Sequence, residues 1–214
     1  MLQTFAISNQ TTLKYLRDRF ALERDERPDF FPEWQTDLPE LTEGDRAFLA
    51  RIRSRFFYQL EEGSLLENGV KMMMVSPLLD LAGFYDPPFR TQFEPSVEVS
   101  IEDYDEVIQG RIDALLIQDK LWIWVIEAKR TTFSLSLGIP QAIAYMLANP
   151  AKQKPIYGLL CSGEDFLFIK LQPGHSSRNA NPVYGISRKM SLLNPDDLPQ
   201  VLQILRRMGA DAVG

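Results

Sequence analysis

The sequence predicts an α/β (α+β) protein in which a central mixed β-sheet is flanked by helices on both faces. Two observations carry this prediction. Residues 110–126 hold two apolar runs on either side of a short polar link, which is the pattern of a β-hairpin buried on both faces. Amphipathic helical segments stand before this hairpin, and a further helix and two short apolar strands follow it. Such an order favours a sheet covered on both sides.

The first part of the chain is predicted to be helical. Apolar residues recur at helical spacing over residues 11–22, behind Thr11 or Thr12 as a cap. A connector rich in Pro, Asp and aromatic residues leads to a longer helix that starts near Thr42 and stops at Gly63. We therefore expect one compact domain, with an N-terminal helical extension over residues 1–62 packed on a core over residues 63–214.

Three basic residues of the longer helix, Arg51, Arg53 and Arg55, lie mostly off its apolar stripe. Their position favours a solvated face over contact with phosphates.

The core elements follow from periodicity and turn residues. Residues 64–82 are predicted to be helical, with a kink or restart at Pro77. Residues 103–106 are expected to form the turn that enters the hairpin. Strands are predicted at 96–102, 155–161, 165–171 and 184–187, and helices at 138–147 and from Asn194 onwards.

The hairpin register decides which side chains share a face. A three-residue link centred on Asp119 would place Asp113 opposite Val125, and alternation then puts Glu127 and Lys129 on the same face as Asp113. A link one residue shorter would send the two carboxylates to opposite sides of the sheet.

These three residues suit metal-dependent phosphodiester hydrolysis. Two neighbouring carboxylates, Asp113 and Glu127, form an oxygen site for a divalent ion, and the Lys129 ammonium can orient the attacking water. Because Cys161 and His175 are the only residues of their kinds, a thiolate zinc cage is excluded, which favours Mg²⁺ or Mn²⁺. The alternative is that these three residues only form a salt bridge at the solvent-exposed end of a sheet.

Composition limits the other function classes. The chain has 23 Lys and Arg against 29 Asp and Glu, so its formal net charge of -6 argues against a generally basic coat for nucleic acid. Neither a signal peptide nor an apolar run long enough for a membrane helix is apparent. A single cysteine fits a reducing compartment, so we expect a cytoplasmic protein with no membrane partner.

Several segments resemble a known family when they are taken in order. They are LLENGVKMMMVSPLLDLAGF, GRIDALLI, WVIEAKR, QAIAY and PIYGLLCSG. In these the chain resembles the PD-(D/E)xK nuclease superfamily, in particular the N-terminal nuclease-like domain of type I restriction enzyme R subunits and small stand-alone cyanobacterial proteins related to it. The resemblance covers roughly residues 64–171.

The resemblance implies a restriction-endonuclease-like core and roles for specific residues. It implies that Asp113 and Glu127 bind Mg²⁺ and that Lys129 is the catalytic lysine. It also implies that Gln141 and Tyr145 form the QxxxY motif beside the cleft, although ordinary packing of helix on sheet would use them equally well.

Glu67 has two interpretations. The resemblance implies that it is the acid of the first core helix, which binds the metal directly or through water. The segment Ser64-Leu65-Leu66-Glu67 is also a capping box, in which the glutamate would bond to the Ser64 backbone. The sequence leaves both open.

The chain departs from the family pattern in two ways. Ile112 stands where Pro is usual, and no Gly-x-x-x-x-Gly-Lys segment is present, so the sequence predicts no ATP-driven motor within it. The expected function is that of a Mg²⁺-dependent deoxyribonuclease related to restriction-modification, with a partner protein supplying motor or specificity functions. The alternative is a catalytically silent nuclease fold that binds nucleic acid or another protein.

Overall fold

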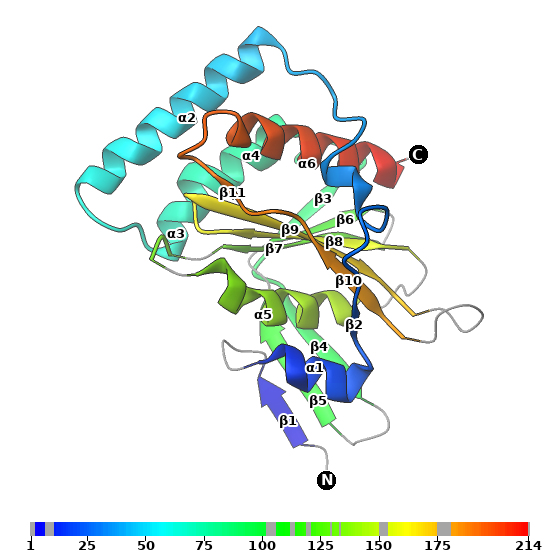
Figure 1. The fold of residues 1–214 in the computed structure, drawn as a ribbon. Coiled ribbons are helices and arrows are strands. Elements are labelled where there is room, and N and C mark those ends of the chain that lie inside the picture. Colours follow the sequence, from blue (N-terminus) through cyan, green and yellow to red (C-terminus); the bar gives the residue numbers. More distant parts are fainter. Residues whose placement is uncertain are drawn as a thin grey trace.

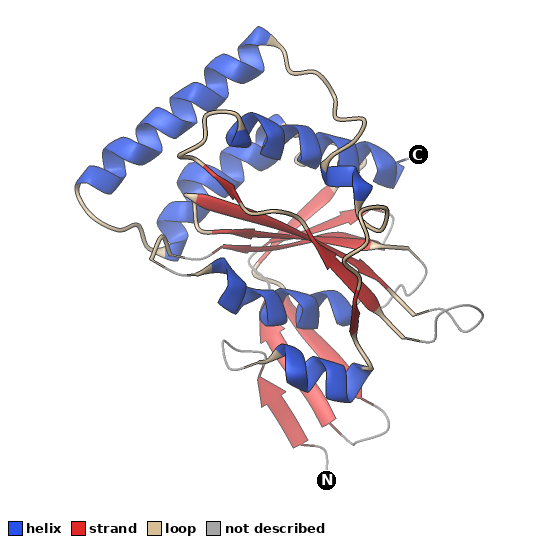
Figure 2. Cartoon of the chain, in the orientation of Figure 1, coloured by secondary structure: helices blue, strands red, loops and turns tan. Residues whose placement is uncertain are grey.

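Two β-sheets organise the chain in the computed structural model (Figures 1 and 2). The structure describes residues 3–6, 11–101, 106–111, 114–118, 121–128, 130–132, 134–149, 154–174 and 181–213. Residues 3–6, 97–101, 106–111, 114–118, 121–128 and 212–213 are described by their backbone.

The helical elements are α1 (Leu13–Phe20), η1 (Pro32–Trp34), α2 (Glu43–Glu61), α3 (Glu67–Val70), η2 (Lys71–Val75), α4 (Ser76–Leu81), α5 (Leu135–Leu147) and α6 (Asp197–Val213). The strands are β1 (Gln3–Ala6), β2 (Glu23–Arg24), β3 (Arg90–Phe93), β4 (Ser96–Ile101), β5 (Glu106–Arg111), β6 (Ala114–Gln118), β7 (Leu121–Ala128), β8 (Ile156–Cys161), β9 (Asp165–Gln172), β10 (Val183–Ile186) and β11 (Met190–Ser191).

The larger sheet has the order β2-β10-β9-β8-β7-β6-β3, with β11 beside β9. β7 runs parallel to β8, whereas β6 and β9 run antiparallel to their neighbours, so the sheet is mixed as predicted. One buried cluster lies under α2, α4 and α6, and a second lies under α5 and α1. The predicted cover of helices on both faces is confirmed (Figure 2).

A smaller sheet of order β1-β5-β4 was not predicted. The sequence assigned Gly110 and Arg111 to the central hairpin, but they end β5, which pairs antiparallel with β4. The predicted strand at 96–102 is present as β4. The short strands β2 and β3 also escaped prediction, because two to four residues carry no periodic pattern.

Local sequence signals explain most helix ends. Thr12 caps α1 by accepting a hydrogen bond from the Tyr15 amide, as predicted. Thr42 and Asp45 form a reciprocal capping box at the start of α2. The expected kink before Pro77 is a π-helical turn in which the Ser76 amide donates to the carbonyl of Lys71.

Two helix boundaries differ from the prediction. α5 begins at Leu135 rather than Gly138, so Pro140 lies inside it, where one intrahelical donor is lost. α6 begins at Asp197 rather than at Asn194. The Asn194 side chain accepts a hydrogen bond from the Asp196 amide, which makes a turn before the helix starts.

A buried ion pair joins the two longest helices. The Asp45 carboxylate accepts hydrogen bonds of 2.8 and 2.7 Å from the Arg206 guanidinium, which also donates to the Leu81 carbonyl. The Asp45 side chain is 8% exposed, and hydrogen bonds from Arg206 and Thr42 hold its pKa far below the ordinary range. The Asp45–Arg206 pair therefore ties α2 to α6, and Arg206 ties both to the end of α4.

We expect Asp45→Ala to destabilise the protein by about 2 kcal/mol, because it removes a helix cap and leaves a half-buried guanidinium without its carboxylate. Urea denaturation measures this change. Asp18→Ala is the control, since the Lys14–Asp18 pair is exposed and solvent screens such pairs, so its loss should change stability little. Equal losses in the two variants would contradict the role of Asp45.

Stability should also fall in acid through Asp45 and Asp197, whose pKa values are lowered by hydrogen bonds from Arg206 and Arg188 respectively. A lowered folded-state pKa gives stability that is fully present above the unfolded value of 3.8 and is lost as the pH falls towards the folded value. The urea midpoint followed against pH should therefore drop in acid by more in the native protein than in Asp45→Asn. Parallel curves would refute the linkage.

Candidate functional site

The hairpin formed by β6 and β7 has a different register from the predicted one. Val125 pairs with Leu115, so the expected pairing of Val125 with Asp113 is wrong. The link spans two residues rather than three, which shifts the pairing by one residue. A bulge between Leu116 and Ile117 shifts it by one more, so that Ala114 pairs with Ile126. A shift of two residues leaves the assignment of positions to faces unchanged beyond the bulge.

The parallel pairing of β7 with β8 defines the face on which Glu127 is positioned. Glu127 is in register with Leu160, and Ala128 is in register with Cys161. Leu160 belongs to the buried cluster under α5, whereas Cys161 belongs to the cluster on the other face. Residues in register on adjacent strands share a face, so Glu127 occupies a position on the α5 side of the sheet.

Gln141 and Tyr145 come from α5 on the same side. Both are buried, with 8% and 1% of their surface exposed, and the Gln141 side-chain amide donates a 3.0 Å hydrogen bond to the Tyr145 hydroxyl. The other polar atom of Gln141, Oε1, is buried and has no hydrogen-bond partner among the described residues. Leaving such an oxygen unpaired is costly, so a polar ligand at this position would be stabilised.

Glu67 stands at the first position of α3 and is exposed. Leu66 rather than Ser64 is the N-cap, and no side chain caps this helix end, so the predicted capping box is not formed. The Glu67 carboxylate lies 3.5 Å from the Lys71 ammonium, which lies 3.6 Å from Glu94. Lys71 was not singled out from the sequence, although its spacing of four residues from Glu67 indicates a helical ion pair.

The start of α3 lies beside the segment that follows β7. The Thr131 amide donates a 3.2 Å hydrogen bond to the carbonyl of Leu65, two residues before Glu67. Figure 1 shows α3 close to the start of α5 at this edge of the sheet. The backbone therefore brings the neighbourhood of Glu67 to the end of the strand that carries Glu127.

Two predicted site residues, Asp113 and Lys129, lie outside the described residues, as does His175. Within the described part of the chain, no group of three or more His, Cys, Asp or Glu side chains is close enough to hold a metal ion. Burial raises the pKa of the Cys161 thiol to about 12, so this residue stays protonated and does not offer a thiolate.

Comparison of the sequence with known protein families and with curated proteins finds no match. Among solved structures, the chain is similar to a fragment described as the HsdR subunit of a type I restriction enzyme from Vibrio vulnificus YJ016, at 19% identity and a TM-score of 0.40. The similarity covers 66% of this chain and 26% of that one, so the chain spans about a quarter of the length of this neighbour. No described helix is long and apolar enough to cross a membrane.

The hydrogen bond between Gln141 and Tyr145 can be tested through stability. We expect Tyr145→Phe to cost about 1 to 2 kcal/mol, because it removes the acceptor of a buried amide. Tyr184→Phe is the matched control, since Tyr184 belongs to the same buried cluster and its hydroxyl makes no hydrogen bond within the described part of the chain. Chemical denaturation measures both, and adding Gln141→Leu to Tyr145→Phe should recover part of the loss.

Proposed function

We propose that this protein is a Mg²⁺-dependent deoxyribonuclease that hydrolyses DNA phosphodiester bonds at a site formed by Asp113, Glu127 and Lys129. The observation that supports it most is the register of β7, which positions Glu127 on the sheet face that also carries the buried Gln141–Tyr145 pair. The position of Glu127 and the Gln141–Tyr145 pair therefore belong to the same side of the sheet.

The hairpin register supports a place for Asp113 in the same site. Ala114 pairs with Ile126, so one further step of the same ladder would set Asp113 opposite Glu127. Residues directly opposite share a face, which is the requirement for two carboxylates to hold one cation. Lys129 lies two residues after Glu127, and alternation assigns it to that face as well.

Each residue has a distinct role in the proposed reaction. Asp113 and Glu127 would hold the cation, and Glu67 at the start of α3 would bind it directly or through water. When bound, Mg²⁺ would neutralise charge on the phosphate and lower the pKa of a coordinated water. The Lys129 ammonium would orient that water and stabilise the developing oxyanion. Gln141 and Tyr145 would border the site and offer Gln141 Oε1 as an acceptor.

Metal-dependent cleavage is the direct test. Purified protein should degrade linear, circular or single-stranded DNA in Mg²⁺ or Mn²⁺, and Asp113→Ala and Lys129→Ala should each lower the rate by at least about 10²-fold. Lys154→Ala is the matched control for Lys129→Ala, because Lys154 is an exposed lysine without an ion-pair partner in the described part of the chain. Cutting that persists in Asp113→Ala and Lys129→Ala would refute the assignment.

Metal binding distinguishes an active enzyme from a silent nuclease fold. Calorimetric titration with Mn²⁺ should show binding to the native protein and a loss of binding in Asp113→Ala and in Glu127→Ala. Retained Mn²⁺ binding without cleavage of any DNA form would instead support a binding module that keeps the fold. Restriction partners that supply a motor or a specificity function belong to this proposal and are not needed for the test.

A further inference from the structure

A groove of about 660 Å³ runs between α2 and the segment that opens α6, on the sheet face opposite α5. From α2 it is lined by Arg46, Arg53, Phe57 and Tyr58. Pro195 and Pro199 belong to the opposite wall. No residue proposed for catalysis lies in it, so the groove is a feature of its own.

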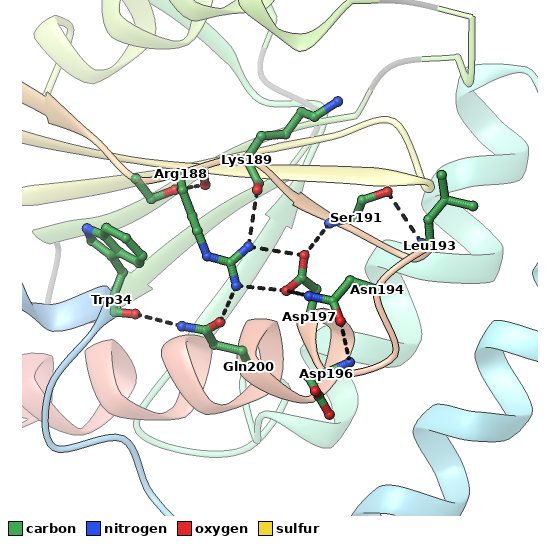
Figure 3. Close-up of polar contacts among 10 residues, drawn as sticks. Trp34, Arg188, Lys189, Ser191, Leu193, Asn194, Asp196, Asp197 and Gln200 are labelled. Carbon is green, nitrogen blue, oxygen red and sulfur yellow. Dashed lines mark hydrogen bonds and ion pairs between the residues drawn. The ribbon is translucent and has the colours of Figure 1, made fainter.

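Polar contacts hold the α6 wall in place (Figure 3). The Arg188 guanidinium donates hydrogen bonds of 3.1 and 2.7 Å to the two carboxylate oxygens of Asp197, the first residue of α6. Asp197 also accepts from the Ser191 amide at 2.8 Å. From the other wall, Arg53 Nε donates a 2.8 Å bond to the carbonyl of Leu192. Contacts from both sides therefore preform the groove.

Positive charge is concentrated in the middle of α2, between acidic residues at its two ends. Residues 46–60 contain four arginines and no acidic residue, although acidic residues outnumber basic ones in the chain as a whole. None of these four forms an ion pair with a carboxylate in the described part of the chain, whereas Arg188, Arg206 and Arg207 are all paired. Helical spacing sets Arg46 and Arg53 on the groove side, and Arg55 further round the helix.

Aromatic rings accompany these charges. The Tyr58 side chain lines the groove while 63% of its surface is exposed. The Arg53 guanidinium lies 4.9 Å from the centre of the Phe57 ring, within the range of a cation–π contact. Two carboxylates, Glu61 and Asp196, also line the groove, so its positive charge is local rather than continuous.

We propose that this groove binds a single strand of nucleic acid, with phosphates beside Arg46 and Arg53 and a base stacked on Tyr58. Guanidinium groups that have no carboxylate partner in the described part of the chain, beside an exposed aromatic ring, suit a strand whose bases are unstacked, because such bases offer a free ring face. The choice of nucleic acid among polyanions rests on the proposed function. The groove reaches Glu61 at the end of α2, four residues before the Leu65 carbonyl that Thr131 contacts.

Binding without cleavage tests this proposal. The protein is titrated in EDTA into a labelled single-stranded oligodeoxythymidine of about 15 nucleotides, within the site sizes of single-strand binders. We expect Arg46→Gln and Tyr58→Ala each to raise the Kd about tenfold, which corresponds to about 1.4 kcal/mol. Arg55→Gln, the matched control with the same loss of charge on the same helix, should leave the Kd within about twofold.

The salt dependence gives a second readout that a loss of folding would not reproduce. Removing one phosphate contact should reduce the slope of log Kd against log salt by about 0.7 in Arg46→Gln and leave it unchanged in Arg55→Gln. Equal effects of the two substitutions would overturn the proposal, as would no binding by the native protein.

An acidic peptide is the competing occupant. If polyglutamate binds with the same dependence on Arg46 and the oligonucleotide does not, the groove is a protein-binding site and the proposal is wrong. Because the assay contains no divalent metal, it is independent of catalysis. The Mn²⁺ titration reports on the proposed metal site and the EDTA binding assay reports on the groove, so failure of the groove and failure of the nuclease site are separately visible.

Discussion

The parallel pairing of β7 with β8 is the constraint on which the candidate site depends. Two parallel neighbours cannot be joined by a tight turn, so the chain between them must cross one face of the sheet, and α5 makes that crossing. This crossing sets Gln141 and Tyr145 over the strand that carries Glu127. A different partner for β7 would separate the polar residues of α5 from the end of that strand.

On the sheet face opposite α5, buried ion pairs hold the helices and the connector between α1 and α2 in place. Asp45 binds Arg206 across α2 and α6, and Lys170 on β9 binds Glu33 in the connector between the first two helices. Glu33 also accepts a 3.1 Å hydrogen bond from the Tyr157 hydroxyl, and burial together with this carboxylate raises the pKa of Tyr157, which stays neutral. Such pairs fix orientation as much as they stabilise, since a misplaced partner leaves a buried charge unpaired.

The sequence predicted correctly those features that depend on residues close to one another in the chain. Thr12 and Thr42 cap the helices that they were expected to cap, and Pro77 disturbs the helix that it was expected to disturb. It failed where a distant partner decides: residues 106–111 pair with β4 in a second sheet, and a bulge next to Ile117 moves the hairpin register by a residue. Neither the second sheet nor the bulge produces a periodic pattern in the sequence.

By itself, the sequence determined the types of element, the mixed α/β class and the identity of the polar residues worth testing, because caps, periodicity and side-chain chemistry are local properties. Only the tertiary structure decided which face each residue serves. The β7–β8 register assigns Glu127 to the side of α5, and the contact between Thr131 and Leu65 brings the start of α3 to the end of β7. The tertiary structure also gives different surroundings to two arginines of α2 that look alike in the sequence, since Arg53 lines the groove and Arg55 does not. Those outcomes depend on contacts between residues far apart in the chain, which local patterns do not encode.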